Sequence, residues 1–298
     1  MDNPRKLVNL HRTKRKQMSK HIFRDYKAYA LVTGAASGMG RLYARRLACM
    51  GYNVIIVDIN AERLAETGSL VREDVDAMSL PEDVAARFSM ISIVQDLSLP
   101  DAADSVFSRT EEEGCEVEVL VNNAGLMYCL GIAETSERML SLIMAVHMTT
   151  PLMLCRKYVN GMKSRGCGYI LNISSLAAWM IWPGIGMYGS TKRFVKDYSR
   201  ELRIECCNTG VSVTNAYFGA VDTPLVPLKE SLRRLARGLR VMIRPEKAVD
   251  KALKAMFRRR KGVMPGLLNK IFRPLCVIMP DCLLGWIYRK AKPYLMKV

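Results

Sequence analysis

The chain has 298 residues, of which 50% are apolar and 24% charged, so it is long and apolar enough to bury a full core. This composition excludes a disordered or low-complexity protein. Nine cysteines without a CxxC pair and only three histidines argue against a disulfide scaffold or a zinc module, so we expect buried, inert thiols and no metal site.

The formal net charge of +17 is concentrated at the two ends of the chain. Residues 1–27 carry 9 basic and 2 acidic side chains, residues 28–227 carry 17 and 22, and residues 228–298 carry 19 and 4. A mildly acidic body between basic ends favours a soluble enzyme with a surface-binding segment over a protein that binds nucleic acid. Because residues 1–27 hold no apolar core, we expect no secretory signal there and predict a cytoplasmic protein.

The distribution of apolar runs divides the chain into three parts. Residues 1–27 form a basic N-terminal arm, and residues 267–298 form a basic, apolar C-terminal tail. Between 28 and 266, short apolar runs alternate with longer helix-prone segments, which predicts an α/β fold: one Rossmann-type domain with a doubly wound parallel sheet of about seven strands. The expected strands are 29–33, 53–57, 91–95, 117–121, 169–173, 212–216 and 262–264. Residues 73–90 are compatible with either an extra helix or a loop.

A glycine-rich turn follows the first expected strand, and its sequence is Thr33-Gly34-Ala35-Ala36-Ser37-Gly38-Met39-Gly40. Glycines between a strand and a helix let the backbone approach a pyrophosphate at the positive end of that helix. Asp58 ends the second strand, where a carboxylate accepts both ribose hydroxyls of NAD and repels the 2′-phosphate of NADP. Since positions 35–37 and 59–60 hold no Lys or Arg, we predict NAD as the cofactor. A solvated carboxylate without a cofactor contact is the alternative.

Two further motifs follow the next strands: Asp96-Leu97 after the third, and Asn122-Asn123-Ala124-Gly125 after the fourth. Together with the glycine turn and Asp58, they resemble the classical short-chain dehydrogenase/reductase family over roughly residues 28–266. The resemblance places Asp96 close to the adenine and the 122–125 segment in support of the sheet and the cofactor. It implies cofactor contacts from Gly34, Ser37, Gly38, Met39, Gly40, Asp58, Asp96, Leu97, Asn123, Ala124 and Gly125.

Another motif supplies candidate catalytic residues. Tyr188 and Lys192 stand four residues apart at the start of a predicted helix, and Ser175 ends a strand thirteen residues before Tyr188. Oxidation of a carbinol leaves a proton on oxygen, and a phenol, with a pKa near ~10, needs a nearby cation to handle that proton close to neutrality. The resemblance implies that Tyr188 is the acid/base, that Lys192 also binds the nicotinamide ribose and that Ser175 holds the substrate oxygen. An ordinary helix pair, and Ser174 as the active hydroxyl, are the alternatives.

The sequence departs from the family pattern at two positions. Where the family has Asn in the helix after the 122–125 segment, this chain has His147. The resemblance implies that His147 keeps a helix kink, replaces the water of a proton relay or weakens catalysis, and a satisfied core histidine is the alternative. Phe218 stands where the family commonly has Pro, whereas Thr223 matches the threonine that contacts the carboxamide.

Apolar side chains gather on two segments that border the substrate site in this fold. They are Leu126, Met127 and Tyr128, then Trp179, Met180, Ile181, Trp182, Pro183, Ile185 and Met187. We predict a small-molecule substrate with a bulky apolar body, such as a steroid-like or lipid-like alcohol, rather than a sugar. Ordinary packing or a subunit interface is the alternative.

Basic, apolar segments complete the chain. Residues 224–244 correspond to the mobile lid of the family and place Leu228, Leu232, Leu235 and Leu239 at helical spacing among arginines. Pro274, Pro280 and Pro293 interrupt the tail, so it is too broken to span a membrane. With residues 258–261, these segments suit an anionic membrane surface, where each Lys or Arg adds roughly 1 kcal/mol. A solvated basic face is the alternative.

The sequence therefore predicts an NAD(H)-dependent oxidoreductase that interconverts a secondary alcohol and a ketone, peripheral on membranes and, as in relatives, a homodimer or homotetramer. A 3-oxoacyl thioester reductase is one alternative, because residues 261–271 also resemble tails of 17β-hydroxysteroid dehydrogenase and 3-oxoacyl-CoA reductase relatives. A non-catalytic, membrane-associated dinucleotide-binding scaffold is another, favoured only by His147.

Overall fold

The computed structural model describes residues 28–79, 82–128, 130–179, 181, 184–222, 242–266, 269, 274 and 277–295. The predicted N-terminal arm, nearly all of the predicted lid and Thr223 therefore lie outside the described residues. The same holds for Met180, Trp182 and Pro183 of the expected substrate segment.

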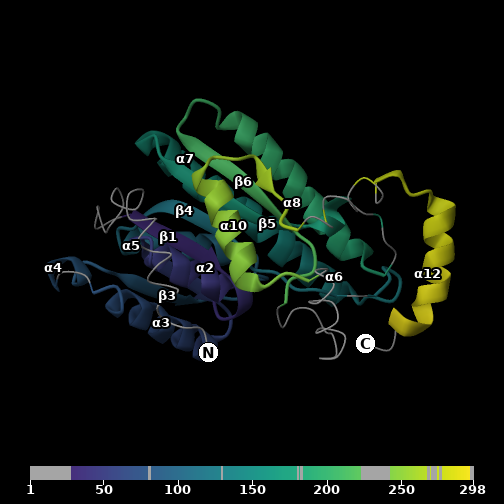
Figure 1. Ribbon diagram of the computed structural model, residues 1–298, viewed down its shortest axis with the longest axis horizontal. Coiled ribbons are helices and arrows are strands. Elements are labelled where there is room, and N and C mark those ends of the chain that lie inside the picture. The colour runs from purple at the N-terminus through teal and green to yellow at the C-terminus, as the bar shows by residue number, and fades with distance from the viewer. Residues whose placement is uncertain are drawn as a thin grey trace.

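Seven parallel strands form one sheet in the order β3-β2-β1-β4-β5-β6-β7 (Figure 1). They are β1 (Ala28–Thr33), β2 (Asn53–Asp58), β3 (Met90–Val94), β4 (Glu116–Asn122), β5 (Gly168–Ser175), β6 (Val211–Phe218) and β7 (Gly262–Val263). The chain reverses its direction of travel across the sheet between β1 and β4. In such a sheet, ligands bind at the carboxyl ends of the strands beside that reversal. Thr33, Asn122 and Ser175 lie at or near these strand ends.

Helices cover both faces of the sheet. One face carries α2 (Gly38–Ala48), α3 (Ala61–Asp76) and α10 (Pro245–Phe257), and the other carries α5 (Ala102–Glu112), α7 (Thr150–Arg165) and α8 (Gly186–Glu205). In Figure 1, α2 and α10 lie in front of the sheet. The remaining elements are α4 (Glu82–Ala85), α6 (Glu137–Met144), the π-helical turn η1 (Ala145–Thr149), the 3₁₀ turn η2 (Leu176–Trp179) and α12 (Asp281–Leu295).

The strands are apolar along their whole length because both faces of the sheet are buried. In β1, Ala30 and Val32 pack toward α2 and α10, whereas Leu31 packs toward α5, α7 and α8. All three side chains are fully buried. This double burial stabilises the two layers and fixes the register that aligns the strand ends.

The predicted fold class is confirmed, and each expected strand is present within two residues of its expected ends. The uncertain segment 73–90 resolves into the end of α3 at Asp76, the short helix α4 and the start of β3 at Met90.

One continuous helical stretch of the described residues, Glu137–Arg165, is long and apolar enough to cross a membrane by length and composition. It comprises α6, η1 and α7. Its buried residues, among them Leu154, Tyr158 and Met162, pack in the core beneath the sheet. We therefore interpret it as a core helix of this fold.

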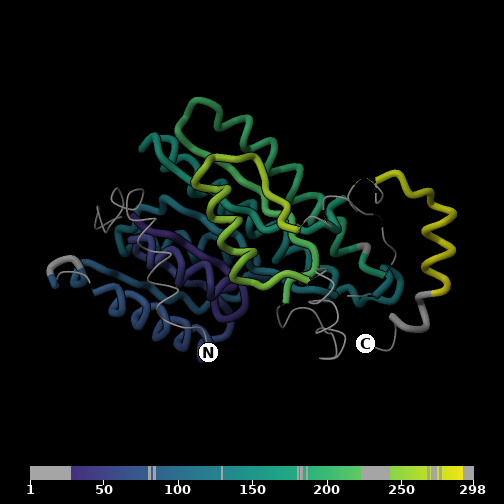
Figure 2. The backbone as a smooth tube through the Cα atoms, in the orientation of Figure 1, coloured from purple at the N-terminus to yellow at the C-terminus, as the bar shows by residue number. Residues whose placement is uncertain are grey.

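The helix α12 lies at the edge of the molecule, away from the sheet (Figure 2). Leu284 is buried, whereas Leu283 and Trp286 are 43% and 53% exposed. Directly before the helix, Val277 and Ile278 are also exposed. This part of the chain thus presents apolar side chains outward.

Candidate active site

The glycine turn between β1 and α2 has no space for a side chain at Gly34 or Gly40. A Cβ atom on Gly40 would lie 1.9 Å from the carbonyl oxygen of Gly34, and Gly34 itself has a φ of +66°. Close backbone contact at this point leaves the amide groups at the start of α2 accessible at the strand ends. The turn therefore fits a dinucleotide pyrophosphate, as the sequence predicts.

Asn123 fastens this turn to the end of β4. Its side-chain amide donates to the carbonyl oxygens of Thr33 and Gly34 at 3.0 and 3.3 Å. In return, the Thr33 hydroxyl oxygen accepts from the backbone amides of Asn123 and Ala124 at 3.0 and 3.1 Å. The predicted site omitted Thr33, although it opens the glycine motif and is buried beside it.

Asp58 lies at the end of β2 and faces the glycine turn. One carboxylate oxygen accepts from the amide of Ala36 and the other from the amide of Asn60, both at 3.0 Å. Each oxygen retains a lone pair for a ribose hydroxyl. The neighbouring Ile59 is 62% exposed.

Arg41 is the basic group that sequence reasoning overlooked beside Asp58. Its guanidinium donates to the carbonyl oxygen of Ala36 at 2.7 Å, whose amide binds Asp58. The same group also binds Thr67 and pairs with Glu66 at 2.9 Å, so it links α2 to α3. The position of Arg41 in the first turn of α2 was the available signal.

Asp96 and Leu97 shape the turn after β3. The Asp96 carboxylate accepts from the amide and hydroxyl of Ser98 at 2.8 and 2.7 Å. Leu97 is buried, and its carbonyl oxygen accepts from the Thr150 hydroxyl at 2.8 Å. Both residues therefore hold this strand end in place, and a cofactor contact from either remains a prediction.

The two candidate serines at the end of β5 have different surroundings. Ser174 is buried, and its hydroxyl donates to the backbone carbonyl of Lys192 at 2.8 Å. Ser175 is partly exposed; its hydroxyl donates to the carbonyl of Phe218 at 3.2 Å and accepts from the amide of Ala177 at 3.1 Å. Ser174 thus supports α8, whereas Ser175 is available to a substrate oxygen.

Tyr188 and Lys192 share one face of α8, as the spacing predicts. The Lys192 ammonium lies 5.7 Å from the centre of the Tyr188 ring and donates to the carbonyl oxygen of Ile173 at 3.1 Å. Lys192 is only 5% exposed, and its burial lowers its pKa from 10.5 to about 8. The side chain is therefore a buried cation at neutral pH.

His147 lies in the π-helical turn η1 and is buried beside the same pair. Its ring packs edge-on against the Tyr188 ring, with 5.7 Å between centroids. Nε2 accepts from the backbone amide of Leu126 at 2.9 Å, and Nδ1 lies 3.0 Å from the Thr191 hydroxyl. Burial and the charge of Lys192 lower the pKa of His147 well below its ordinary value. The ring is therefore neutral.

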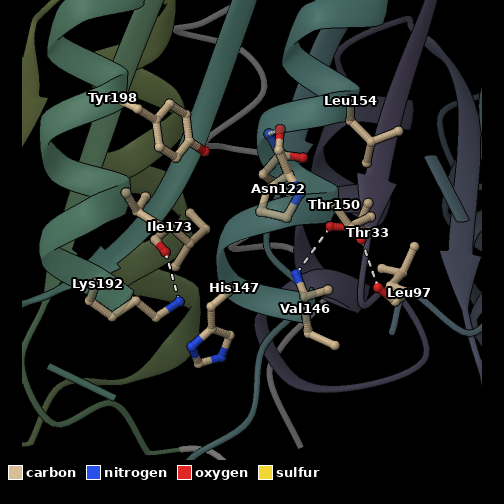
Figure 3. Close-up of a pocket in the computed structure, with 13 residues that line it drawn as sticks. Thr33, Leu97, Asn122, Val146, His147, Thr150, Leu154, Ile173, Lys192 and Tyr198 are labelled. Carbon is tan, nitrogen blue, oxygen red and sulfur yellow. Dashed lines mark hydrogen bonds between the residues drawn. The ribbon is translucent and has the colours of Figure 1, made fainter. Parts of the chain in front are cut away.

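Lys192 and His147 are among the residues that line a small cavity (Figure 3). It measures about 10 Å³ and is lined by Asn122 and Tyr198 among others. Asn122 Oδ1 and the Tyr198 hydroxyl are buried and have no hydrogen-bond partner among the described residues, so the space suits about one water molecule.

A larger cavity of about 260 Å³ is lined by Ser175, Tyr188 and Lys192. Its apolar lining includes Met39, Leu126, Met127, Ile185, Phe218 and Val221. Three of the residues expected at a substrate site, Leu126, Met127 and Ile185, are thus in place.

The expectation that Trp179 and Ile181 contact the substrate is not met by the lining of this cavity. Its ring packs edge-on against Tyr217 at 5.7 Å, and the Lys196 ammonium lies 4.6 Å from its centre, so the indole is a packing residue outside the lining of the cavity. Ile181 is 61% exposed and lies outside that lining as well. Within the part of the chain that the structure describes, no group of three His, Cys, Asp or Glu residues is arranged to hold a metal ion.

Comparison with known proteins identifies the family and relatives of the chain. The short chain dehydrogenase family matches residues 28–233. The chain is 28% identical to 17-beta-hydroxysteroid dehydrogenase type 3 of Mus musculus, over 70% of this chain and 65% of that protein. It is also 28% identical to a very-long-chain 3-oxoacyl-CoA reductase of Mycosarcoma maydis, over 79% of this chain and 63% of that protein.

Solved structures show the same fold. A short-chain dehydrogenase from Sphingobium yanoikuyae in complex with NADPH aligns with a TM-score of 0.68 at 22% identity, over 85% of this chain and 96% of that one. A 7beta-hydroxysteroid dehydrogenase aligns with a TM-score of 0.73 at 24% identity, over 85% and 93%.

The buried ammonium yields a prediction about stability. Because the pKa of Lys192 is lower in the folded than in the unfolded chain, the unfolded state binds more protons between about pH 8 and pH 10.5, and stability rises with pH across that window. The lowered pKa means that burial of the charged lysine costs ~3 kcal/mol of folding free energy at pH 7. Removal of the lysine recovers this cost but also loses the hydrogen bond to Ile173, which contributes ~1 kcal/mol. We expect Lys192→Met to stabilise the protein at pH 7 by roughly 2 kcal/mol.

Thermal unfolding of both proteins between pH 7 and pH 10 measures this effect. The advantage of the variant should shrink as the pH rises, because the wild-type lysine becomes able to lose its proton. The exposed Lys251→Met on α10 serves as the control and should change little. A Lys192→Met protein that is less stable than wild type at pH 7 would contradict the prediction.

Proposed function

The chain belongs to the short-chain dehydrogenase family, and from that premise we propose that it uses NAD(H) to interconvert a secondary alcohol and a ketone on a bulky apolar substrate. The family is one of oxidoreductases that bind a nicotinamide dinucleotide. One observation carries the rest of the proposal: Ser175, Tyr188 and Lys192 line one cavity whose remaining walls are largely apolar.

When bound, the nicotinamide donates or accepts the hydride. The protein's own residues handle the proton that accompanies it. The Tyr188 phenol exchanges a proton with the substrate oxygen, and the buried Lys192 cation stabilises negative charge on the phenol oxygen. To hold a ketone oxygen, the Ser175 hydroxyl turns its single hydrogen from the Phe218 carbonyl to the substrate, while the bond from the Ala177 amide keeps the hydroxyl oxygen at the cavity wall.

The choice of NAD is supported by the carboxylate of Asp58 at the end of β2. Asp58 faces the turn where a ribose would lie, and an added 2′-phosphate would meet its negative charge. Arg41, the nearby basic group, is already paired with Glu66. NADP is the alternative, because the dehydrogenase from Sphingobium yanoikuyae was solved with NADPH.

Asp58→Ala tests the cofactor. We expect roughly 10- to 100-fold weaker NADH binding, because hydrogen bonds to a charged acceptor contribute about 1.5–3 kcal/mol. NADPH binding should weaken less, so the preference for NADH over NADPH narrows. Fluorescence titration with both nucleotides measures the ratio of the two dissociation constants, and the exposed Asp76→Ala on α3 should leave that ratio unchanged. A ratio unchanged by Asp58→Ala would show that Asp58 does not face the ribose.

Tyr188→Phe tests the reaction. Removal of the proton-transferring hydroxyl should lower turnover by roughly 10² or more while NADH binding persists. A panel of secondary steroid alcohols and 3-hydroxyacyl thioesters supplies the substrates and also separates the two substrate classes. Tyr169→Phe, whose ring packs against Phe257 away from the cavity, is the matched control. Wild-type turnover in Tyr188→Phe would end the assignment, and a wild-type protein that binds the dinucleotide but turns over no substrate of the panel would favour the scaffold alternative.

The basic, apolar end of the chain supports a second proposal, that the enzyme binds anionic membranes. Residues 228–298 carry 19 basic and 4 acidic side chains. In the described part of this region, Ile278 and Trp286 are 72% and 53% exposed, with Arg289 and Lys290 exposed on the same helix. Apolar side chains beside cations are the combination that an anionic bilayer surface attracts.

Trp286→Glu tests membrane binding by co-sedimentation with phosphatidylcholine vesicles that contain or lack phosphatidylserine. Wild type should sediment only with the anionic vesicles, and less as salt rises, since the screening length falls to about 8 Å at physiological salt. The variant should lose binding, whereas Ile204→Glu, at a 63% exposed position on α8, should retain it. Equal sedimentation with both vesicle types, or none with either, would contradict the proposal.

A further inference from the structure

The turn η1 holds a histidine whose two ring nitrogens are both engaged inside the protein. His147 is only 1% exposed. Nε2 faces the amide of Leu126, in the segment that follows β4, and Nδ1 faces the hydroxyl of Thr191 in α8. Thr191 is fully buried and stands between Tyr188 and Lys192 in sequence. The ring therefore joins the two segments that border the larger cavity.

The hydrogen-bond directions permit one arrangement of protons. A backbone amide only donates, so Nε2 of His147 must carry a lone pair and Nδ1 must carry the hydrogen of the neutral ring. Nδ1–H then donates to the Thr191 oxygen, and the Thr191 hydroxyl donates to the carbonyl oxygen of Tyr188 at 2.9 Å. Every donor in the series thus meets an acceptor.

The surroundings oppose the charged form of the ring. A second N–H at Nε2 would point at the Leu126 amide, donor against donor. The Lys192 ammonium is also close to the His147 ring, since both groups face Gly125. A Cβ atom placed on Gly125 would lie 3.0 Å from Nε2 of His147 and 3.5 Å from Nζ of Lys192. A ring that has both nitrogens bonded and cannot charge is unsuited to pass protons between substrate and solvent.

We propose that His147 and Thr191 act as a positioning pair, in which the neutral, Nδ1-protonated ring ties the backbone of Leu126 to the helical turn that carries Tyr188 and Lys192. The pair fixes the distance between the segment after β4 and the catalytic face of α8. His147 is then a positioning residue, and the sequence expectation of a relay role gives way to this one. The kinetic consequences rest on the proposed oxidoreductase function, whereas the protonation state does not.

The protonation state is measured on the protein without substrate. The chain has only three histidines, so His11→Gln with His21→Gln leaves His147 as the sole imidazole and alters no residue of the described fold. In ¹⁵N-edited NMR, we expect a neutral ring with the proton on Nδ1 from pH 8 to pH 6. An imidazolium, or a proton on Nε2, at pH 7 would overturn the proposal whether or not the enzyme turns over.

Thr191 variants measure what the pair does. Thr191→Val removes the hydroxyl at nearly constant shape and should lower kcat roughly 10-fold, because small displacements of catalytic groups cost one to two orders of magnitude. NADH affinity should stay within a few-fold, and Thr191→Ser should restore kcat. An unchanged kcat in Thr191→Val would overturn the proposal.

A double-mutant cycle separates positioning from relay. His147→Phe keeps an aromatic ring without nitrogens. If the two residues form one link, the combined variant should lose no more kcat than the more damaged single variant. Additive losses would show independent roles and overturn the pair, as would a steep kcat loss in His147→Phe that Thr191→Val does not share.

Discussion

A lysine cation kept inside the protein is the constraint on which the rest of the active site depends. The Lys192 ammonium has a single described acceptor, the carbonyl oxygen of Ile173, and almost no contact with solvent. A buried charge is costly to hold, so its neighbours must be neutral or negative when the chemistry occurs. The neutral ring of His147 meets this demand, and so does a phenol that can give up its proton. Ser174 supports the same turn of α8 through the Lys192 carbonyl.

The parallel sheet provides the rigidity that this arrangement requires. The last residue of β4, Asn122, pairs with Asn172 of β5, and the two side-chain amides are themselves bonded at 2.8 Å. Beyond this pair, β4 gives way to the segment that holds the glycine turn, whereas β5 runs on to its end at Ser175. The glycine turn and Ser175 are therefore aligned by backbone register.

Much of the fold and of the candidate site was predictable from the sequence, because parallel strands that are buried on both faces have uninterrupted apolar sequences. The seven strands, the glycine turn and the face shared by Tyr188 and Lys192 follow from spacing alone. Thr33, Arg41 and Thr191 were not found in this way. Each is a common polar residue whose importance lies in a partner far away in the chain, and spacing does not specify side-chain direction.

Trp179 illustrates the same limit from the apolar side. Its position between Ser175 and Tyr188 suggested a substrate contact, yet its ring packs against Tyr217. A large aromatic residue gains similar free energy from burial in a cavity wall or in the packing behind it, so composition alone does not separate these outcomes.

The number of residues in the π-helical turn η1 determines which way His147 faces. A π turn holds one residue more than an α turn, and each residue of an α-helix rotates the chain by about 100°. Loss of one residue between α6 and α7 would leave the helix continuous and just as apolar, but would turn His147 away from Thr191 or α6 away from the core. Insertions and deletions here therefore alter catalytic alignment without altering hydrophobicity, so sequence comparisons of this helix should count residues as well as match them.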